Sequence, residues 1–258
     1  MGSGTVWHSA CITGASSGLG WELALALSQP GKLLILSARH EDRLQVLRQL
    51  VETKGAKAIV CPADLTQAEE IQRLVYCIEE NLPDLFINNA GYGRYGWIFE
   101  PGTDHSLIDV NLQAPIELSH AWTRLCLEKQ ISGKMVFIAS IAALVPCPGM
   151  AAYGASKAAL LSFAEAMRYE LRKTALDVLT VCPGPFKTGF RERAKGRSTY
   201  LSSQEAREIA FRIVSIVSKR TGVYIVPPWS WLRIFQPFIP QSWLMAWIER
   251  AVNQLRRD

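Results

Sequence analysis

The chain has 258 residues, of which 49% are hydrophobic and 20% charged, with a formal net charge of +5. This balance is typical of a folded domain with a sizeable core and excludes a disordered chain. Lysine and arginine are too sparse to indicate a nucleic-acid-binding protein. We expect no secretory signal, because the N-terminus lacks a charged region followed by a long apolar segment. We expect no membrane-spanning helix, because no uninterrupted apolar stretch reaches roughly 18 residues.

The cysteines and histidines carry little functional signal. The six cysteines are scattered singly, without a C-x-x-C pair, and most lie in or beside apolar runs. A disulfide framework is therefore not expected, and the sequence favours a reducing, cytoplasmic compartment. The four histidines have no metal-ligand spacing, so we expect no metal site.

Short apolar runs alternate with longer helical patterns along most of the chain. The runs are rich in Val, Ile and Leu without polar alternation, as in strands covered on both faces. The predicted strands are residues 6–12, 32–37, 58–61, 84–87, 134–138, 177–181 and 223–226. The predicted helices are residues 19–28, 41–54, 67–81, 105–128, 152–173 and 203–218. This order predicts an α/β fold, a doubly wound parallel sheet of about seven strands with helices on both faces.

A glycine-rich turn joins the first strand to the first helix. Its sequence is Thr13-Gly14-Ala15-Ser16-Ser17-Gly18-Leu19-Gly20. Glycines let backbone amides approach a pyrophosphate, and the helix N-terminus favours its negative charge. We therefore predict that Gly14, Ser16, Ser17, Gly18, Leu19 and Gly20 bind the phosphates of a dinucleotide. A tight turn with a purely structural role is the alternative.

The end of the second predicted strand indicates which dinucleotide is bound. A site for NAD places a carboxylate near this point, where it would repel a 2′-phosphate. Here Ala38 stands at about that position and Arg39 and His40 follow. A guanidinium is a permanently charged, forked partner for phosphate, so we predict NADP(H) bound by Arg39 with help from His40. In the alternative interpretation, Arg39 is only a solvated residue at a strand end.

Three residues in the second half of the chain have the chemistry of a carbonyl–alcohol site. Ser140 follows the fifth predicted strand, and Tyr153 and Lys157 form Y-x-x-x-K on a helix. Four residues are about one helical turn, so phenol and ammonium share a face. We expect Lys157 to lower the pKa of Tyr153, Tyr153 to exchange a proton with the substrate oxygen, and Ser140 to hydrogen-bond the same oxygen.

The order of these motifs, together with Asn88-Asn89-Ala90-Gly91, Asn111 and Pro183-Gly184, resembles the single-domain branch of the short-chain dehydrogenase/reductase family. The resemblance runs from about Val6 to Val226 and implies a Rossmann-type fold. It implies an adenine contact for Asp64 and Leu65, and a water-holding role in a proton relay for Asn111. It places Asn89, Ala90, Gly91, Pro183, Gly184 and Thr188 beside the cofactor, with Lys157 at the nicotinamide ribose.

The chain divides into a predicted dinucleotide-binding catalytic domain, residues 1–226, and an aromatic C-terminal appendage, residues 227–258. Half of the eight tryptophans lie in the appendage, which ends in Arg256-Arg257 and Asp258. Its composition is compatible with three alternative roles. It could pack against the domain or a partner subunit, form a lid over a long-chain substrate, or contact a membrane surface. Similar tails in family members that act on lipid-like ketones favour an apolar substrate. A basic loop at 186–201 and an apolar group, Tyr92, Tyr95, Trp97 and Leu144, are the predicted substrate-side elements.

The sequence therefore predicts an NADP(H)-dependent oxidoreductase that transfers a hydride between nicotinamide and a ketone or secondary alcohol, with an apolar or acyl-chain substrate. The alternative is a non-catalytic NADP-binding sensor or scaffold. The expected partner is a small carbonyl or alcohol substrate and not nucleic acid. A homo-oligomer is expected, located in the cytoplasm and, if the appendage binds lipid, at a membrane surface.

Overall fold

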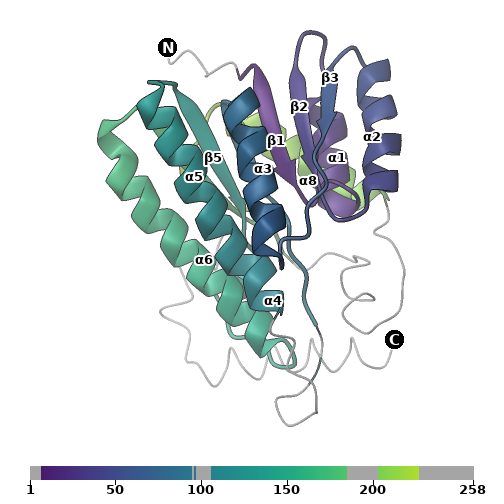
Figure 1. Ribbon diagram of the computed structural model, residues 1–258. Coiled ribbons are helices and arrows are strands. Elements are labelled where there is room, and N and C mark those ends of the chain that lie inside the picture. The colour runs from purple at the N-terminus through teal and green to yellow at the C-terminus, as the bar shows by residue number, and fades with distance from the viewer. Residues whose placement is uncertain (1–6, 95, 97–105, 185–202, 227–258) are drawn as a thin grey trace.

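A computed structural model describes residues 7–94, 96, 106–184 and 203–226. Its strands form one parallel sheet in the order β3-β2-β1-β4-β5-β6-β7 (Figure 1). The strands are β1 Ser9–Thr13, β2 Leu33–Ser37, β3 Lys57–Val60, β4 Leu85–Asn88, β5 Gly133–Ile138, β6 Leu176–Cys182 and β7 Gly222–Ile225. The predicted doubly wound parallel sheet is confirmed, with strand ends shifted by a few residues.

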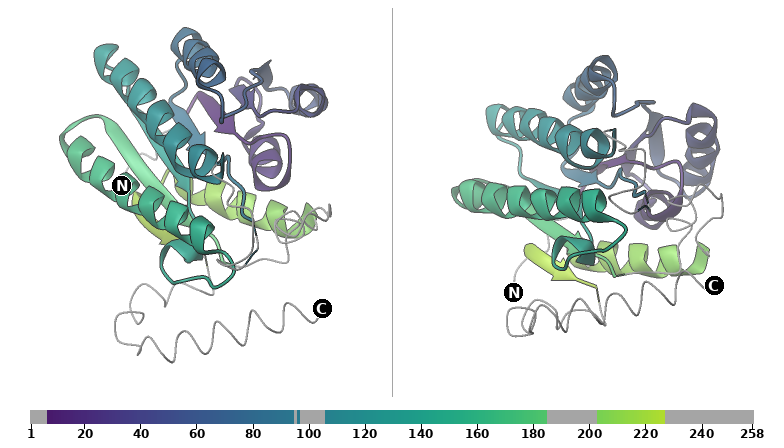
Figure 2. Two further views of the ribbon diagram at one scale, coloured as in Figure 1. Left: turned by 60° about the horizontal axis from the view of Figure 1, so that its bottom comes forward. Right: turned by 90° about the horizontal axis from the view of Figure 1, so that it is seen from below.

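Helices cover both faces of the sheet, as the views in Figure 2 show. On one face lie α1 Gly18–Leu27, α2 Glu41–Thr53 and α8 Ser203–Val217; on the other lie α3 Ala68–Asn81, α5 Ala114–Glu128 and α6 Ala151–Glu170. The predicted helix over 105–128 is confirmed from Ser106 onward, but it contains a π-helical segment that the sequence does not predict. The structure divides this stretch into α4 Ser106–Ile108, the π-helix η1 Asp109–Gln113, and α5.

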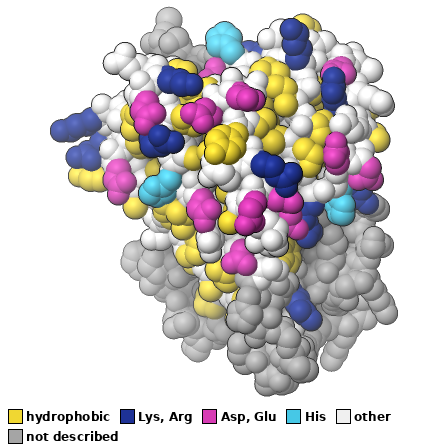
Figure 3. Space-filling model, in the orientation of Figure 1, with side chains coloured by type: hydrophobic (Ala, Val, Ile, Leu, Met, Phe, Trp, Pro, Cys, Tyr) yellow, Lys and Arg dark blue, Asp and Glu magenta, His cyan; other side chains and the backbone are white. Residues whose placement is uncertain are grey.

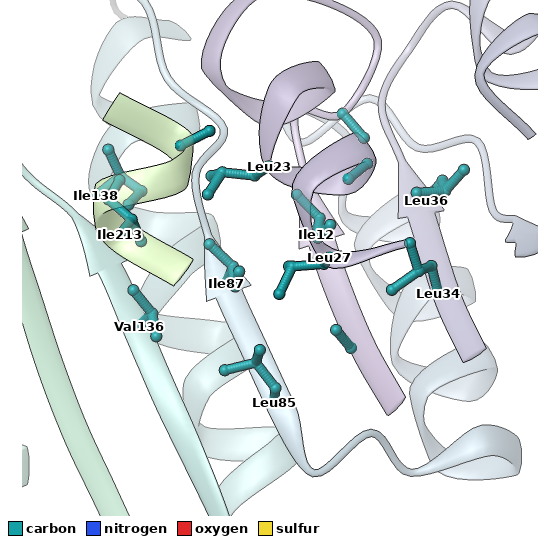
Figure 4. Close-up of a cluster of buried hydrophobic side chains, with 14 of the residues drawn as sticks. Ile12, Leu23, Leu27, Leu34, Leu36, Leu85, Ile87, Val136, Ile138 and Ile213 are labelled. Atoms are coloured by element: carbon teal, nitrogen blue, oxygen red, sulfur yellow. The ribbon is translucent and has the colours of Figure 1, made fainter. Parts of the chain in front are cut away.

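The core between the sheet and α1, α2 and α8 consists of branched aliphatic side chains. Leu23 and Leu27 on α1 and Ile213 on α8 pack against strand residues that include Ile12 and Ile87 (Figure 4). All five side chains are fully buried, and burial of each one stabilises the fold by about 1.5–3 kcal/mol. This packing fixes α1 against the sheet and so holds the glycine-rich turn in place.

The opposite core contains the larger aromatic side chains. Trp122 of α5 is fully buried, its ring centroid lies 6.4 Å from that of Phe86 in β4, and its Nε1 donates to the carbonyl of Pro83 at 2.7 Å. Phe163 of α6 meets Phe137 of β5 edge to face, with ring centroids 5.9 Å apart. These contacts seat α5 and α6 on β4 and β5, and α6 carries two of the predicted catalytic residues.

The buried side chain of Lys134 connects the end of α8 to strands β5 and β6. The Nζ of Lys134 in β5 donates to the carbonyls of Val217 at 2.8 Å and Arg220 at 2.9 Å, and lies 3.0 Å from the carboxylate of Asp177 in β6. The last carbonyls of a helix have no partner within the helix, and a cation there also meets the negative end of its dipole. Lys134 therefore fixes the C-terminal end of α8.

On the face over α3, α5 and α6, acidic and basic side chains are interspersed (Figure 3). The described part of this face therefore has no extended field of one sign. Among the residues that the structure describes, no helix is both long enough and apolar enough to cross a bilayer.

Candidate active site

The predicted site residues gather where the strands end. The carboxyl ends of the parallel strands point to the lower end of the molecule in Figure 1, where α1 and α6 begin. Open parallel sheets bind ligands at this edge. Residues from six different strand ends meet there: Gly14 after β1, Arg39 after β2, Asp64 after β3, Asn89 after β4, Ser140 after β5 and Pro183 after β6.

The start of α1 has the features of an anion site. Gly18, its first residue, has φ +59°, a backbone conformation that favours glycine. Ser17 makes no side-chain hydrogen bond that caps the helix, and the first turn contains no acidic residue. The positive end of the helix dipole thus faces the edge of the sheet without a carboxylate of its own.

The other two glycines of the turn pack against the chain itself. The Nδ2 of Asn89 donates to the carbonyl of Thr13 at 2.8 Å, and the Thr13 hydroxyl accepts from the amides of Asn89 and Ala90 at 3.0 Å. A Cβ at Gly20 would lie 2.3 Å from the Gly14 carbonyl oxygen, and a Cβ at Gly14 would lie 2.8 Å from the Ala90 Cα. The structural interpretation of these two glycines is therefore correct, whatever else the turn binds.

At the end of β2, Arg39 and His40 are exposed, whereas Ala38 is buried. The carbonyl of Ala38 accepts a hydrogen bond from the amide of Ala63 at 3.1 Å, which brings the segment containing Asp64 beside the Arg39 segment. The Oδ1 of Asp64 accepts from the amide and hydroxyl of Thr66. The predicted 2′-phosphate and adenine residues therefore lie on neighbouring segments.

Ser140, Tyr153 and Lys157 come together as the sequence predicts. The phenol of Tyr153 makes a hydrogen bond with Ser140, whose Oγ also accepts from the amide of Ala142 at 3.1 Å. The Nζ of Lys157 lies 6.0 Å from the centroid of the Tyr153 ring and donates to the carbonyl of Ile138 at 3.0 Å. Lys157 is only 4% exposed, so its cation is held at the edge of the sheet, out of bulk water.

Burial controls the proton affinities of this group. Desolvation lowers the pKa of Lys157 to about 8. Desolvation also raises the pKa of Tyr153 to about 12, and the hydrogen bond with Ser140 offsets only part of this increase. The net shift of the Tyr153 pKa is therefore upward, opposite to the lowering that the sequence predicts. The phenol is protonated at neutral pH and is suited to donate its proton.

Asn111 lies in the π-helix η1 and is fully buried. Its Nδ2 donates to the Tyr92 carbonyl at 2.8 Å and to the Ser156 hydroxyl at 3.1 Å, and its Oδ1 accepts from the Tyr92 amide at 2.9 Å. The Ser156 hydroxyl donates in turn to the carbonyl of Tyr153 at 2.8 Å. The amide of Asn111 thus joins the segment after β4 to the turn of α6 that carries Tyr153.

Gly91 packs closely against the side chains of Asn111 and Lys157. A Cβ at this position would lie 3.0 Å from the Oδ1 of Asn111 and 3.1 Å from the Nζ of Lys157. A side chain here would crowd both groups. The Asn89-Ala90-Gly91 segment therefore contacts the glycine-rich turn at one end and the ammonium of Lys157 at the other.

A sequence profile of the family described as short chain dehydrogenase matches residues 8–198. The chain belongs to the short-chain dehydrogenase family.

Relatives of this short-chain dehydrogenase occur in bacteria. Probable oxidoreductase EphD of Mycobacterium tuberculosis is 26% identical over 96% of this chain, which spans only 43% of that protein. An uncharacterized oxidoreductase of Staphylococcus epidermidis is 32% identical, over 84% of this chain and 93% of the relative. A short-chain dehydrogenase from Sphingobium yanoikuyae, solved in complex with NADPH, is 27% identical with a TM-score of 0.77, over 92% of this chain and 94% of its own.

No role was predicted from the sequence for two residues of the site, Thr13 and Ser156. Thr13 is the first residue of the glycine-rich motif and Ser156 directly precedes Lys157. Their hydroxyl groups bridge segments far apart in sequence, and their positions in or beside a motif were the signal that could have found them. Thr188, Tyr95, Trp97, the predicted loop at 186–201 and the appendage at 227–258 lie outside the described residues.

Proposed function

We propose that this short-chain dehydrogenase is an NADP(H)-dependent oxidoreductase that transfers a hydride between nicotinamide and a carbonyl or alcohol carbon. The observation that carries the proposal is the hydrogen bond between Ser140 and the Tyr153 phenol, beside the buried ammonium of Lys157. A proton donor, a second hydrogen-bonding group and a cation meet at one edge of the sheet. Carbonyl reduction requires groups of this kind around the reacting oxygen.

The residues at the strand ends fit a phosphorylated dinucleotide. The uncapped start of α1 suits the pyrophosphate, and the exposed Arg39 and His40 suit a 2′-phosphate. No carboxylate stands at Ala38 to prefer a ribose hydroxyl. The NADPH complex of the Sphingobium relative supports the same cofactor. When bound, NADPH supplies the hydride.

Each side chain then has a distinct role. Tyr153, protonated at neutral pH because burial raises its pKa to about 12, donates a proton to the substrate oxygen. Ser140 turns its hydroxyl proton toward the same oxygen and stabilises its developing negative charge. Lys157 holds the cofactor ribose and adds a positive charge next to the phenol. Asn111 positions the first turn of α6 through Ser156 and holds a water for proton return.

We propose an apolar or acyl-chain ketone as the substrate. The support is the partly buried Leu144 close to Ser140, the aromatic residues predicted near the site, and the aromatic-rich sequence at 227–258. The chain spans under half of the EphD oxidoreductase it matches, so that relative's whole activity is no guide to this substrate.

The decisive test of catalysis is NADPH oxidation with 3-ketoacyl thioesters, steroid ketones and long-chain ketones. Tyr153→Phe should lower turnover by about 10²–10⁴-fold while NADPH still quenches the protein fluorescence. Tyr169→Phe is the matched control, because Tyr169 lies on the same helix and is 62% exposed. An active Tyr153→Phe enzyme would refute the proposed proton donor. NADPH binding without turnover on any ketone would favour the sensor.

The cofactor assignment is tested separately with Arg39→Asp. Removing the guanidinium and adding a carboxylate should reverse the preference for NADPH over NADH, measured as the ratio of kcat/KM values. Arg48→Asp makes the same charge change on the exposed surface of α2 and should leave the ratio unchanged. An unaltered ratio in Arg39→Asp would rule out Arg39 as the phosphate partner.

A further inference from the structure

Three cysteines point into the same layer of the molecule, between the sheet and α3. Cys11 lies in β1, Cys61 directly follows β3, and Cys77 lies in α3. All three belong to, or pack against, the cluster of side chains under α3 and α5. Cys11 is fully buried, whereas Cys61 and Cys77 are only partly buried. These two thiols are therefore the members of the group that a small solute can reach.

Cys61 and Cys77 are in direct contact. Both side chains pack against the same cluster and their thiols are close enough to interact, and the Nδ2 of Asn81 lies 4.0 Å from the Cys77 sulfur. A hydrogen bond from Cys61 lowers the pKa of Cys77, with a smaller contribution from Asn81, against the opposing effects of burial and Glu80. The pKa of Cys61 is raised by the same hydrogen bond and by burial, and Arg73 opposes the increase. Cys77 is therefore the more easily ionised thiol of the pair.

We propose that Cys61 and Cys77 form a redox-active dithiol that hydrogen peroxide closes into a reversible disulfide. The Cys77 thiolate attacks one peroxide oxygen, giving Cys77 sulfenic acid and releasing hydroxide. The Cys61 thiol then attacks the Cys77 sulfur, the S–S bond forms, and the sulfenic oxygen leaves as water. Overall, two thiols lose two electrons and two protons, and one peroxide is reduced to two waters.

The disulfide would act on the segment proposed to bind the cofactor. The amide of Cys61 donates to the carbonyl of Leu36 at 2.9 Å, and the amide of Ala63 donates to that of Ala38. These bonds join the Cys61 segment to the end of β2, next to Arg39. Drawing Cys61 toward α3 strains this connection. Tyr153 and Lys157 lie on α6, on the same face of the sheet but on the far side of α5 from α3 (Figure 1). This effect rests on the proposed function, and we expect a higher KM for NADPH with little change in kcat.

The disulfide can be detected by peptide mass spectrometry, without any activity measurement. Native full-length protein is treated with hydrogen peroxide, alkylated under non-reducing conditions and mapped by peptide mass spectrometry. We expect one linked peptide pair containing Cys61 and Cys77, lighter by two hydrogen atoms and separated by dithiothreitol. Cys147, also partly buried, should remain alkylated and reports on general oxidation. In Cys61→Ser the linked pair should be absent.

Several results would overturn the proposal. Cys61 and Cys77 that both remain alkylatable while Cys147 is oxidised would exclude a reactive pair. Sulfinic acid at Cys77 with an unmodified Cys61 would exclude Cys61 as its resolving partner. A disulfide that leaves the KM for NADPH unchanged, relative to peroxide-treated Cys61→Ser, would refute the coupling to the cofactor segment. A reduced enzyme without any NADPH oxidation would instead count against the proposed function and leave the mapping result standing.

Discussion

Replacing Lys157 by methionine removes a buried ammonium group and keeps an unbranched side chain. Lys157 is 4% exposed, and burial lowers its pKa from 10.5 to about 8. In the unfolded chain the group is hydrated and its pKa returns to 10.5. Between these two pH values the unfolded state binds more protons than the folded state, so stability rises with pH through this window. Below pH 8 the charged lysine opposes folding.

The size of the effect follows from the two pKa values. Each tenfold difference between acid constants corresponds to about 1.4 kcal/mol, so the buried charge costs about 3 kcal/mol at neutral pH. The variant also loses the hydrogen bond from Nζ to the carbonyl of Ile138, which is worth about 1 kcal/mol. We therefore expect Lys157→Met to be more stable than the wild type by about 2 kcal/mol at pH 7. At pH 10.5 the charge no longer matters and the variant should be less stable by about 1 kcal/mol.

Urea unfolding followed by tryptophan fluorescence at pH 7, 8, 9 and 10.5 measures this difference, with both proteins at the same concentration. Taking the difference cancels the titration of groups that both proteins share, Tyr153 included. Lys173→Met, at an exposed position, is the control and should show no pH-dependent difference. A Lys157→Met protein that is less stable than the wild type at pH 7, or a difference independent of pH, would refute the reasoning. Turnover should be lost at every pH.

Four further substitutions test the packing of the site and the attachment of α8 to the sheet. Gly20→Ala places a methyl group against a backbone carbonyl and should lower both the melting temperature and the affinity for NADPH, measured by fluorescence titration; full retention of both would contradict the packing argument. Lys134→Met leaves two carbonyls at the end of α8 unsatisfied and should cost about 2–4 kcal/mol in urea unfolding. Asp177→Asn, whose side chain is 43% exposed, should cost under about 1 kcal/mol, and equal losses would contradict this ranking. Ser156→Ala removes one of the two acceptors for the buried Nδ2 of Asn111; it should cost about 1–3 kcal/mol and lower kcat more than KM, whereas an unchanged kcat would exclude a positioning role.

The strands were predictable because their physical signal is local. A strand covered on both faces must be apolar throughout, and β5 is buried over its whole length. The π-helix at Asp109–Gln113 has no such signal. The side chain of Asn111 pairs with the backbone of Tyr92, and a contact 19 residues away leaves no periodic trace around Asn111. The sequence pattern therefore predicts the helix but not the π-helical segment within it.

For Tyr153 and Lys157, the relative position follows from local helix geometry, whereas the pKa values depend on contacts with distant parts of the chain. Helical spacing predicts that Tyr153 and Lys157 share a face, and they do. Their proton affinities depend on desolvation by segments that arrive from β5 and β6, which spacing alone does not report. Sequence reasoning therefore placed the two groups correctly and assigned the wrong direction to the pKa of Tyr153.

The glycine-rich turn and the catalytic lysine differ in what they imply about function. Gly14 and Gly20 are required by contacts within the chain, so a sensor without catalysis would need them as much as an enzyme does. Lys157 is different, because its buried charge opposes folding at neutral pH and Nζ gains a single carbonyl partner among the described residues. A chain with no use for this cation would be more stable with an apolar side chain in its place. The lysine therefore indicates a functional site, catalytic or cofactor-binding, more strongly than the glycine motif does.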